Sequence, residues 1–172
     1  MNEKEIREEF VKLFGEEKLK EEDLIQKLQE FANYICEEWL GLPSVSVVFD
    51  DLAKTSEASF NIDLGVVLLN KKNKDYILKL LKSTLHELEH YYQLYYVTHF
   101  DTPKAKRWIK ELQNYEANDL LGHHLQEIEL DAMAFAFLVL LVEFGISYQH
   151  PIDLIQELIE TYIDSKRMID DN

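Results

Sequence analysis

The chain has 172 residues, of which 47% are hydrophobic, and its formal net charge at pH 7 is -15. This length and apolar content fit one globular domain with an ordinary core, so we expect a single domain over residues 1–172. The strong negative charge argues against binding to DNA or RNA, which normally needs an extended basic patch.

Neither the N-terminal residues nor the cysteine content indicates export. Cys36 is the single cysteine, so the chain has no internal disulfide and nothing indicates an oxidising compartment. Charged residues begin at Glu3, and no apolar segment of a secretory signal follows. The longest apolar run, 132–142, is well short of the roughly 20 residues that span a bilayer. We therefore expect a cytoplasmic protein without a membrane partner, in which this run forms a buried helix.

Two amphipathic helices are expected in residues 1–42. The first covers residues 3–14 and stops at a glycine. The second covers residues 21–40, with Gly41 as its C-terminal cap and a proline soon after. Cys36 lies in the second helix and is interpreted as a core thiol rather than as a thiolate that binds a metal.

Three short strands are expected next, at the start of the remaining part of the domain, residues 43–172. Residues 44–49, 58–62 and 65–69 are rich in β-branched residues or alternate between apolar and polar ones. A tight turn at 63–65 joins the last two. The strands predict a small, mainly antiparallel sheet.

The rest of the chain predicts four helices, so the fold class is α+β and mostly helical. The first runs from about residue 73 to 99 and contains no glycine or proline. The others cover residues 103–121, 123–144 and 151–162.

The long helix after the sheet contains the motif HExxH, as His86-Glu87-Leu88-Glu89-His90. Residues four apart lie one turn apart on the same helix face, so His86 and His90 are expected to bind one Zn²⁺ ion, with Glu87 beside them as general base. A catalytic zinc ion uses three protein ligands and leaves a fourth position for water. One further ligand is therefore expected elsewhere in the chain.

The helix predicted at 123–144 supplies the candidates for this third ligand. Glu127 and Asp131 are four residues apart and share a face, which suits a ligand and a carboxylate that orients a ligating histidine. Glu127 is the predicted ligand and Asp131 the orienting residue. Gln93 and His124 are expected near the cleft. Other possible third ligands are His123, His124, Glu116 and Glu129.

These motifs resemble those of the gluzincins, a group of zinc metallopeptidases. HELEH, followed in a later helix by EIELDAMA, is similar to their HExxH and E-x-x-A-D-like signatures, although Leu130 occupies the usual alanine position. The order of strands, motif helix and glutamate helix over residues 45–144 also resembles that of the small ImmA/IrrE-type metallopeptidases. Glu89 stands where that group most often has glycine, and the chain lacks both the Met-Pro that follows the glutamate helix and a neighbouring DNA-binding domain. The resemblance implies a zincin-like fold, a zinc cofactor and a peptide or protein substrate.

The expected function is zinc-dependent hydrolysis of peptide bonds through a zinc-bound water activated by Glu87. An alternative is a catalytically silent zincin-fold protein that binds or regulates a partner, and a third is a helical interaction protein without metal. The candidates for stabilising the oxyanion in catalysis are as follows: Tyr115, His123, His124, Tyr148 and His150.

Overall fold

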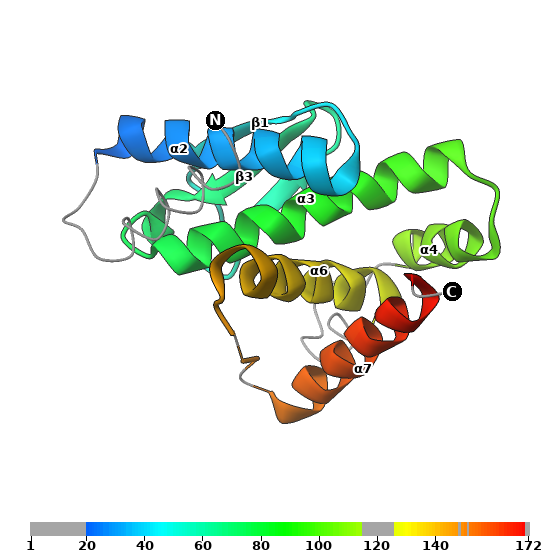
Figure 1. Ribbon diagram of the computed structural model, residues 1–172. Coiled ribbons are helices and arrows are strands. Elements are labelled where there is room, and N and C mark those ends of the chain that lie inside the picture. The colour runs from blue at the N-terminus through cyan, green and yellow to red at the C-terminus, as the bar shows by residue number, and fades with distance from the viewer. Residues whose placement is uncertain (1–19, 115–125, 148, 151, 171–172) are drawn as a thin grey trace. The chain divides into compact units, whose positions relative to one another are not determined.

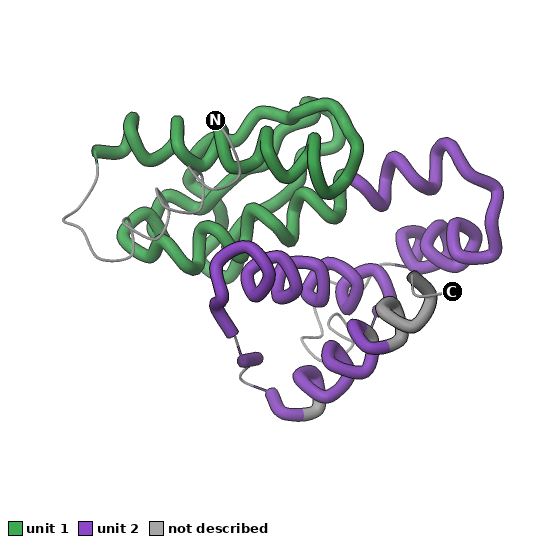
Figure 2. The backbone as a smooth tube through the Cα atoms, in the orientation of Figure 1, with its two compact units in different colours: residues 1–91 green, residues 92–172 purple. Residues whose placement is uncertain are grey.

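The computed structural model describes residues 20–114, 126–147, 149–150 and 152–170. The chain divides into two compact units, residues 1–91 and residues 92–172 (Figure 2). The described residues form an α+β structure with five α-helices and a three-stranded sheet (Figure 1). The boundary between the units falls within helix α3, Ile77–His99.

The first unit begins with helix α2, Glu21–Tyr34, which continues into a π-helical turn, Ile35–Leu40. Gly41 ends the helix in the left-handed conformation (φ 63°), as the sequence predicts, because glycine adopts this conformation without a steric penalty. Cys36 is fully buried, which agrees with its predicted place in the core, and burial raises the pKa of its thiol. The helix predicted at residues 3–14 lies outside the described residues.

The sheet contains β1 (Ser46–Asp50), β2 (Ala58–Asn61) and β3 (Val66–Asn70) in the order β1-β3-β2. The strands occupy nearly the predicted positions, but the sheet is mixed rather than mainly antiparallel. β2 and β3 form an antiparallel hairpin, whereas β1 pairs with β3 in parallel. The reason is that the chain forms β2 at the opposite edge of the sheet from β1, and β3 then runs between β1 and β2.

The predicted turn between β2 and β3 is present. Gly65 has a φ of 62°, and its N–H donates a hydrogen bond of 2.9 Å to the carbonyl of Asn61. Its left-handed conformation allows the chain to reverse between two antiparallel strands.

Helix α2 packs against β1 (Figure 1). The side chain of Gln29 joins the two elements. The Gln29 side chain donates to the carbonyl of Val45 and accepts a hydrogen bond from the N–H of Val47, each at 2.8 Å. The side-chain amide therefore bonds the backbone groups on this edge of β1 that a further strand would otherwise bond.

Helix α3 follows a short 3-10 turn, Lys71–Asn73, in place of the connecting loop expected at residues 70–73. Asn70 caps this turn by accepting a hydrogen bond from the N–H of Lys72. In its first part α3 buries a row of leucines at helical spacing: Leu80, Leu81, Leu85 and Leu88. The motif thus lies inside a long, regular helix, as predicted.

The second unit contains the C-terminal part of α3 together with α4 (Pro103–Gln113), α6 (Glu127–Phe144) and α7 (Asp153–Asp170). Thr102 caps α4 by accepting a hydrogen bond from the N–H of Ala105 at 3.1 Å, as its position before a proline predicts. Helix α6 contacts both α4 and α7. α6 begins four residues later than predicted, and residues 115–125, which were expected to end one helix and begin the next, lie outside the described residues.

Aromatic packing joins the end of α3 to α4. The ring of Tyr96 lies 5.5 Å from that of the fully buried Trp108, and its hydroxyl lies 3.1 Å from the Thr102 hydroxyl. Through these contacts Tyr96 packs the end of α3 against α4. No helix in the described ranges is long and apolar enough to cross a membrane, and the apolar run at 132–142 belongs to α6.

Candidate metal site

The two histidines of the motif face one another on α3. Their Nε2 atoms are 3.0 Å apart, and their rings are perpendicular with centroids 4.6 Å apart. Both side chains are half-buried. This arrangement follows from helix geometry, because residues four apart project from the same face one turn from each other.

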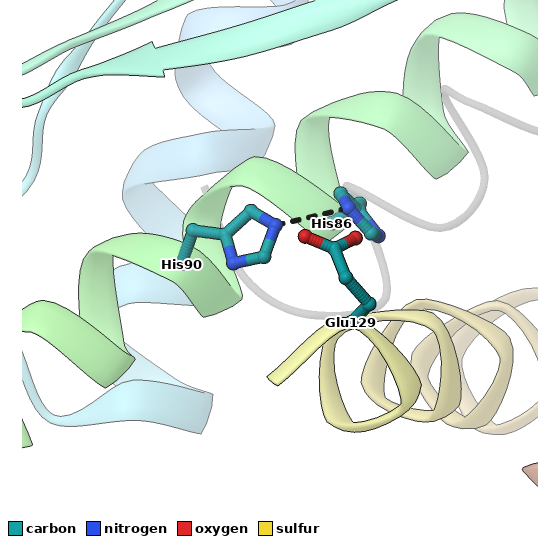
Figure 3. Close-up of side chains that lie close together, drawn as sticks. All are labelled: His86, His90 and Glu129. Atoms are coloured by element: carbon teal, nitrogen blue, oxygen red, sulfur yellow. Dashed lines mark hydrogen bonds between the residues drawn. The ribbon is translucent and has the colours of Figure 1, made fainter. Parts of the chain in front are cut away.

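Glu129, in the first turn of α6, completes a group of three possible metal ligands. One ligand atom from each of His86, His90 and Glu129 lies within 4.8 Å of the other two. Figure 3 shows the Glu129 carboxylate turned toward the two rings. Glu129 is 1% exposed, and buried carboxylates in proteins are normally paired with cations or bound to metals. The three side chains therefore form a candidate metal site.

The structure places Glu129, and not the predicted Glu127, in this group. The Glu127 carboxylate instead accepts hydrogen bonds from Arg107 Nε at 2.9 Å and from Arg107 Nη2 at 3.1 Å. Residues two apart on an α-helix are separated by about 200° around its axis. Glu127 and Glu129 therefore lie on nearly opposite faces of α6, and just one of them is turned toward the histidines.

Two residues predicted near the site are buried and contact one another. Gln93 is 3% exposed, and its Nε2 donates to the carbonyl of Ile128 at 2.8 Å. The same nitrogen lies 3.4 Å from Oδ2 of Asp131, which is fully buried. Gln93 thus bonds α3 to the first turn of α6, and its predicted position near a cleft stays a prediction. The predicted role of Asp131, to orient a histidine, stays a prediction.

Glu87, the predicted general base, follows His86 directly on α3 and is 8% exposed. Five other candidates from the sequence lie outside the described residues: Tyr115, Glu116, His123, His124 and Tyr148. His150 is described and holds the start of α7. Its N–H donates to Gln156 Oε1 at 2.7 Å, and its Nδ1 accepts from the N–H of Ile152 at 3.1 Å.

Two residues that sequence analysis did not single out, Arg107 and Glu111, contact the first turn of α6. Glu111 accepts hydrogen bonds from the N–H groups of Glu127 and Ile128, each at 3.0 Å. Arg107 and Glu111 are four residues apart and therefore share one face of α4. A basic and an acidic residue at this spacing are the sequence signal that could have indicated a polar contact surface on α4.

Comparison with known proteins adds no family assignment, since no protein-family model, curated protein or solved structure matches the chain.

Proposed function

We propose that the protein is a zinc-dependent metallopeptidase with a zincin-like fold. The observation that carries the proposal is the convergence of His86, His90 and Glu129 within 4.8 Å, with Glu87 next to the first histidine. In an HExxH helix the two histidines bind zinc and the glutamate acts as general base. The three possible ligands also match a ligand set, two histidines and one glutamate, that catalytic zinc sites use.

The donor atoms fit zinc better than magnesium or calcium. Imidazole nitrogens are good ligands for zinc, whereas magnesium and calcium prefer sites made of oxygen atoms. Two nitrogens at the usual distance from a tetrahedral zinc ion would lie about 3.3 Å apart. The observed Nε2 separation of 3.0 Å is close to this value. The carboxylate of Glu129 would reduce the net charge of the bound ion from +2 to +1.

The chain's own residues have distinct roles in this proposal. His86 Nε2, His90 Nε2 and a carboxylate oxygen of Glu129 hold the ion. When bound, zinc supplies a Lewis acid that polarises a carbonyl group and lowers the pKa of water. The Glu87 carboxylate accepts the proton of the attacking water and later donates it to the leaving amine of the cleaved peptide bond.

A second candidate is a zinc-binding protein without peptidase activity. It is favoured by the burial of the site, because Glu87 is 8% exposed and Glu129 is 1% exposed. Burial of these two carboxylates would limit the access of a peptide substrate to the ion. This candidate predicts the same metal content as the peptidase but no peptide cleavage.

Metal content of the purified protein tests the shared part of the two candidates. We expect one zinc per chain in the parent and little zinc in His86→Ala, measured by elemental analysis after dialysis. His99→Ala is the matched control, because His99 is an exposed histidine at the end of the same helix. Zinc loss in His86→Ala with retention in His99→Ala would support the site. Absence of zinc from the parent, even after zinc is supplied, would refute it.

Peptide hydrolysis then separates the two candidates. The zinc-loaded parent should cleave members of a quenched fluorescent peptide library, and His86→Ala should cleave none. A zinc-loaded parent without activity on peptides or unfolded proteins would favour the second candidate.

A further inference from the structure

The first turn of α6 is capped by another helix. The first N–H groups of an α-helix have no partner within the helix and are usually capped by the residue that precedes it. Among the described residues the cap comes from Glu111 on α4, whose two carboxylate oxygens accept from the N–H groups of Glu127 and Ile128. A negative charge at this end of a helix also interacts favourably with the helix dipole.

The same turn is held from α3 by Gln93. Its side chain donates to the carbonyl of Ile128 at 2.8 Å, and both residues are almost completely buried. The backbone of Ile128 is therefore bonded at its N–H by α4 and at its carbonyl by α3. Two independent contacts fix this residue, and the next residue in the chain is Glu129.

Gln93 also connects this turn to the histidines. It lies three residues after His90 on the continuous helix α3, so its position relative to both histidines is set by helix geometry. A hydrogen bond from Gln93 to Ile128 thus links the residue before Glu129 to the helix that carries the other two possible ligands.

We propose that Gln93 and Glu111 are positioning residues for the metal site, which hold Ile128 so that Glu129 meets the ion bound by His86 and His90. This inference rests on the proposed function. Neither residue belongs to the group of three possible ligands. Partners that orient ligands typically change metal affinity about 10–100-fold when they are removed.

Gln93→Met is the direct test, because methionine has a similar size but cannot donate a hydrogen bond. We expect zinc affinity, measured by competition with a chromogenic chelator, to fall about 10–100-fold. The absorption spectrum of the cobalt-substituted protein should also change, because loss of a carboxylate ligand alters the coordination of the ion. Gln29→Met is the matched control, since Gln29 bonds two backbone groups of the sheet. It should lower the unfolding midpoint of the metal-free protein and leave zinc affinity unchanged.

The same substitution in a Glu129→Ala background distinguishes positioning from general stabilisation. If Gln93 acts through Glu129, Gln93→Met should cause no further loss of affinity once that carboxylate is absent. Glu111→Gln provides a second variant if Gln93→Met does not fold, and the same pattern is expected for it.

Two results would overturn the inference alone. They are parent-like zinc affinity in both Gln93→Met and Glu111→Gln, or an equal loss with and without Glu129. A parent protein that binds no zinc would instead refute the proposed function on which the inference rests.

Discussion

Replacing Glu129 with glutamine should weaken zinc binding far more than the same replacement of Glu127. Zinc binds to structural sites of four ligands with roughly 10–16 kcal/mol, or about 3 kcal/mol for each ligand. Loss of the Glu129 carboxylate should therefore lower zinc affinity about 100-fold. Glutamine has almost the same shape, so the change removes the charge with little loss of packing.

Glu127→Gln serves as the internal control, since it makes the same substitution two residues away. Glu127 pairs with Arg107, and the two side chains are 27% and 57% exposed. Ion pairs with this exposure contribute about 0–1 kcal/mol to stability. The control should lower the unfolding free energy slightly and leave zinc affinity at the parent value.

Competition with a chromogenic chelator at fixed pH would measure the affinities of the parent and both variants. Metal-free samples of each should be unfolded with urea to check that the variants retain the parent fold. Equal affinity losses in the two variants, or a larger loss in Glu127→Gln, would refute the assignment of Glu129 as the ligand.

Three further predictions concern the general base, an ion pair and the cysteine. Glu87→Gln should retain zinc but lose about 10²–10⁴-fold of its rate of peptide hydrolysis, and an unchanged rate at equal zinc occupancy would contradict the role of Glu87. Burial tends to raise the pKa of Glu57, but its bonds to Lys79 and Lys82 outweigh this effect and hold the pKa below its usual 4.5. Because the folded-state pKa is depressed, Glu57 contributes stability above about pH 4.5 that is lost as the pH falls through the folded-state pKa. Glu57→Gln should thus destabilise the protein by about a few tenths of a kcal/mol at pH 7 and by nothing in acid, as followed by urea unfolding at several pH values. Cys36 should react with Ellman's reagent only when the protein unfolds, because burial raises the pKa of its thiol; rapid reaction of the native protein would contradict this.

Local sequence signals predicted most of the described elements. Gly41 and Gly145 mark the ends of their helices, and Thr102 with Pro103 marks the start of α4, because each residue type suits the backbone conformation at that position. The order of the strands was not predicted. Alternation within a strand indicates which residues share a face, but it does not reveal which strand lies beside which. The continuously apolar sequence of β3 is typical of a central strand, and it was the available signal for the observed order.

The histidine pair could be predicted, whereas the third possible ligand required the tertiary structure. His86 and His90 belong to one helix, so their spacing alone brings them together. The choice between Glu127 and Glu129 depends on how α6 is rotated about its axis. This helix is apolar over most of its circumference and is buried on several faces, so hydrophobic periodicity does not reveal the rotation. The deciding contacts are those of Gln93 and Glu111 with backbone groups in the first turn of α6.

The histidines of the metal site are placed by one helix, whereas Glu129 is placed by contacts between helices. The separation of the two histidines is fixed by the hydrogen bonds within α3, and substitutions outside that helix should leave it unchanged. The position of Glu129, in contrast, depends on bonds that Gln93 and Glu111 make with Ile128. Conditions that weaken the first turn of α6 should therefore remove one possible ligand while leaving the histidine pair intact. Metal affinity would then decrease in a distinct step, before the loss of helical structure in α3.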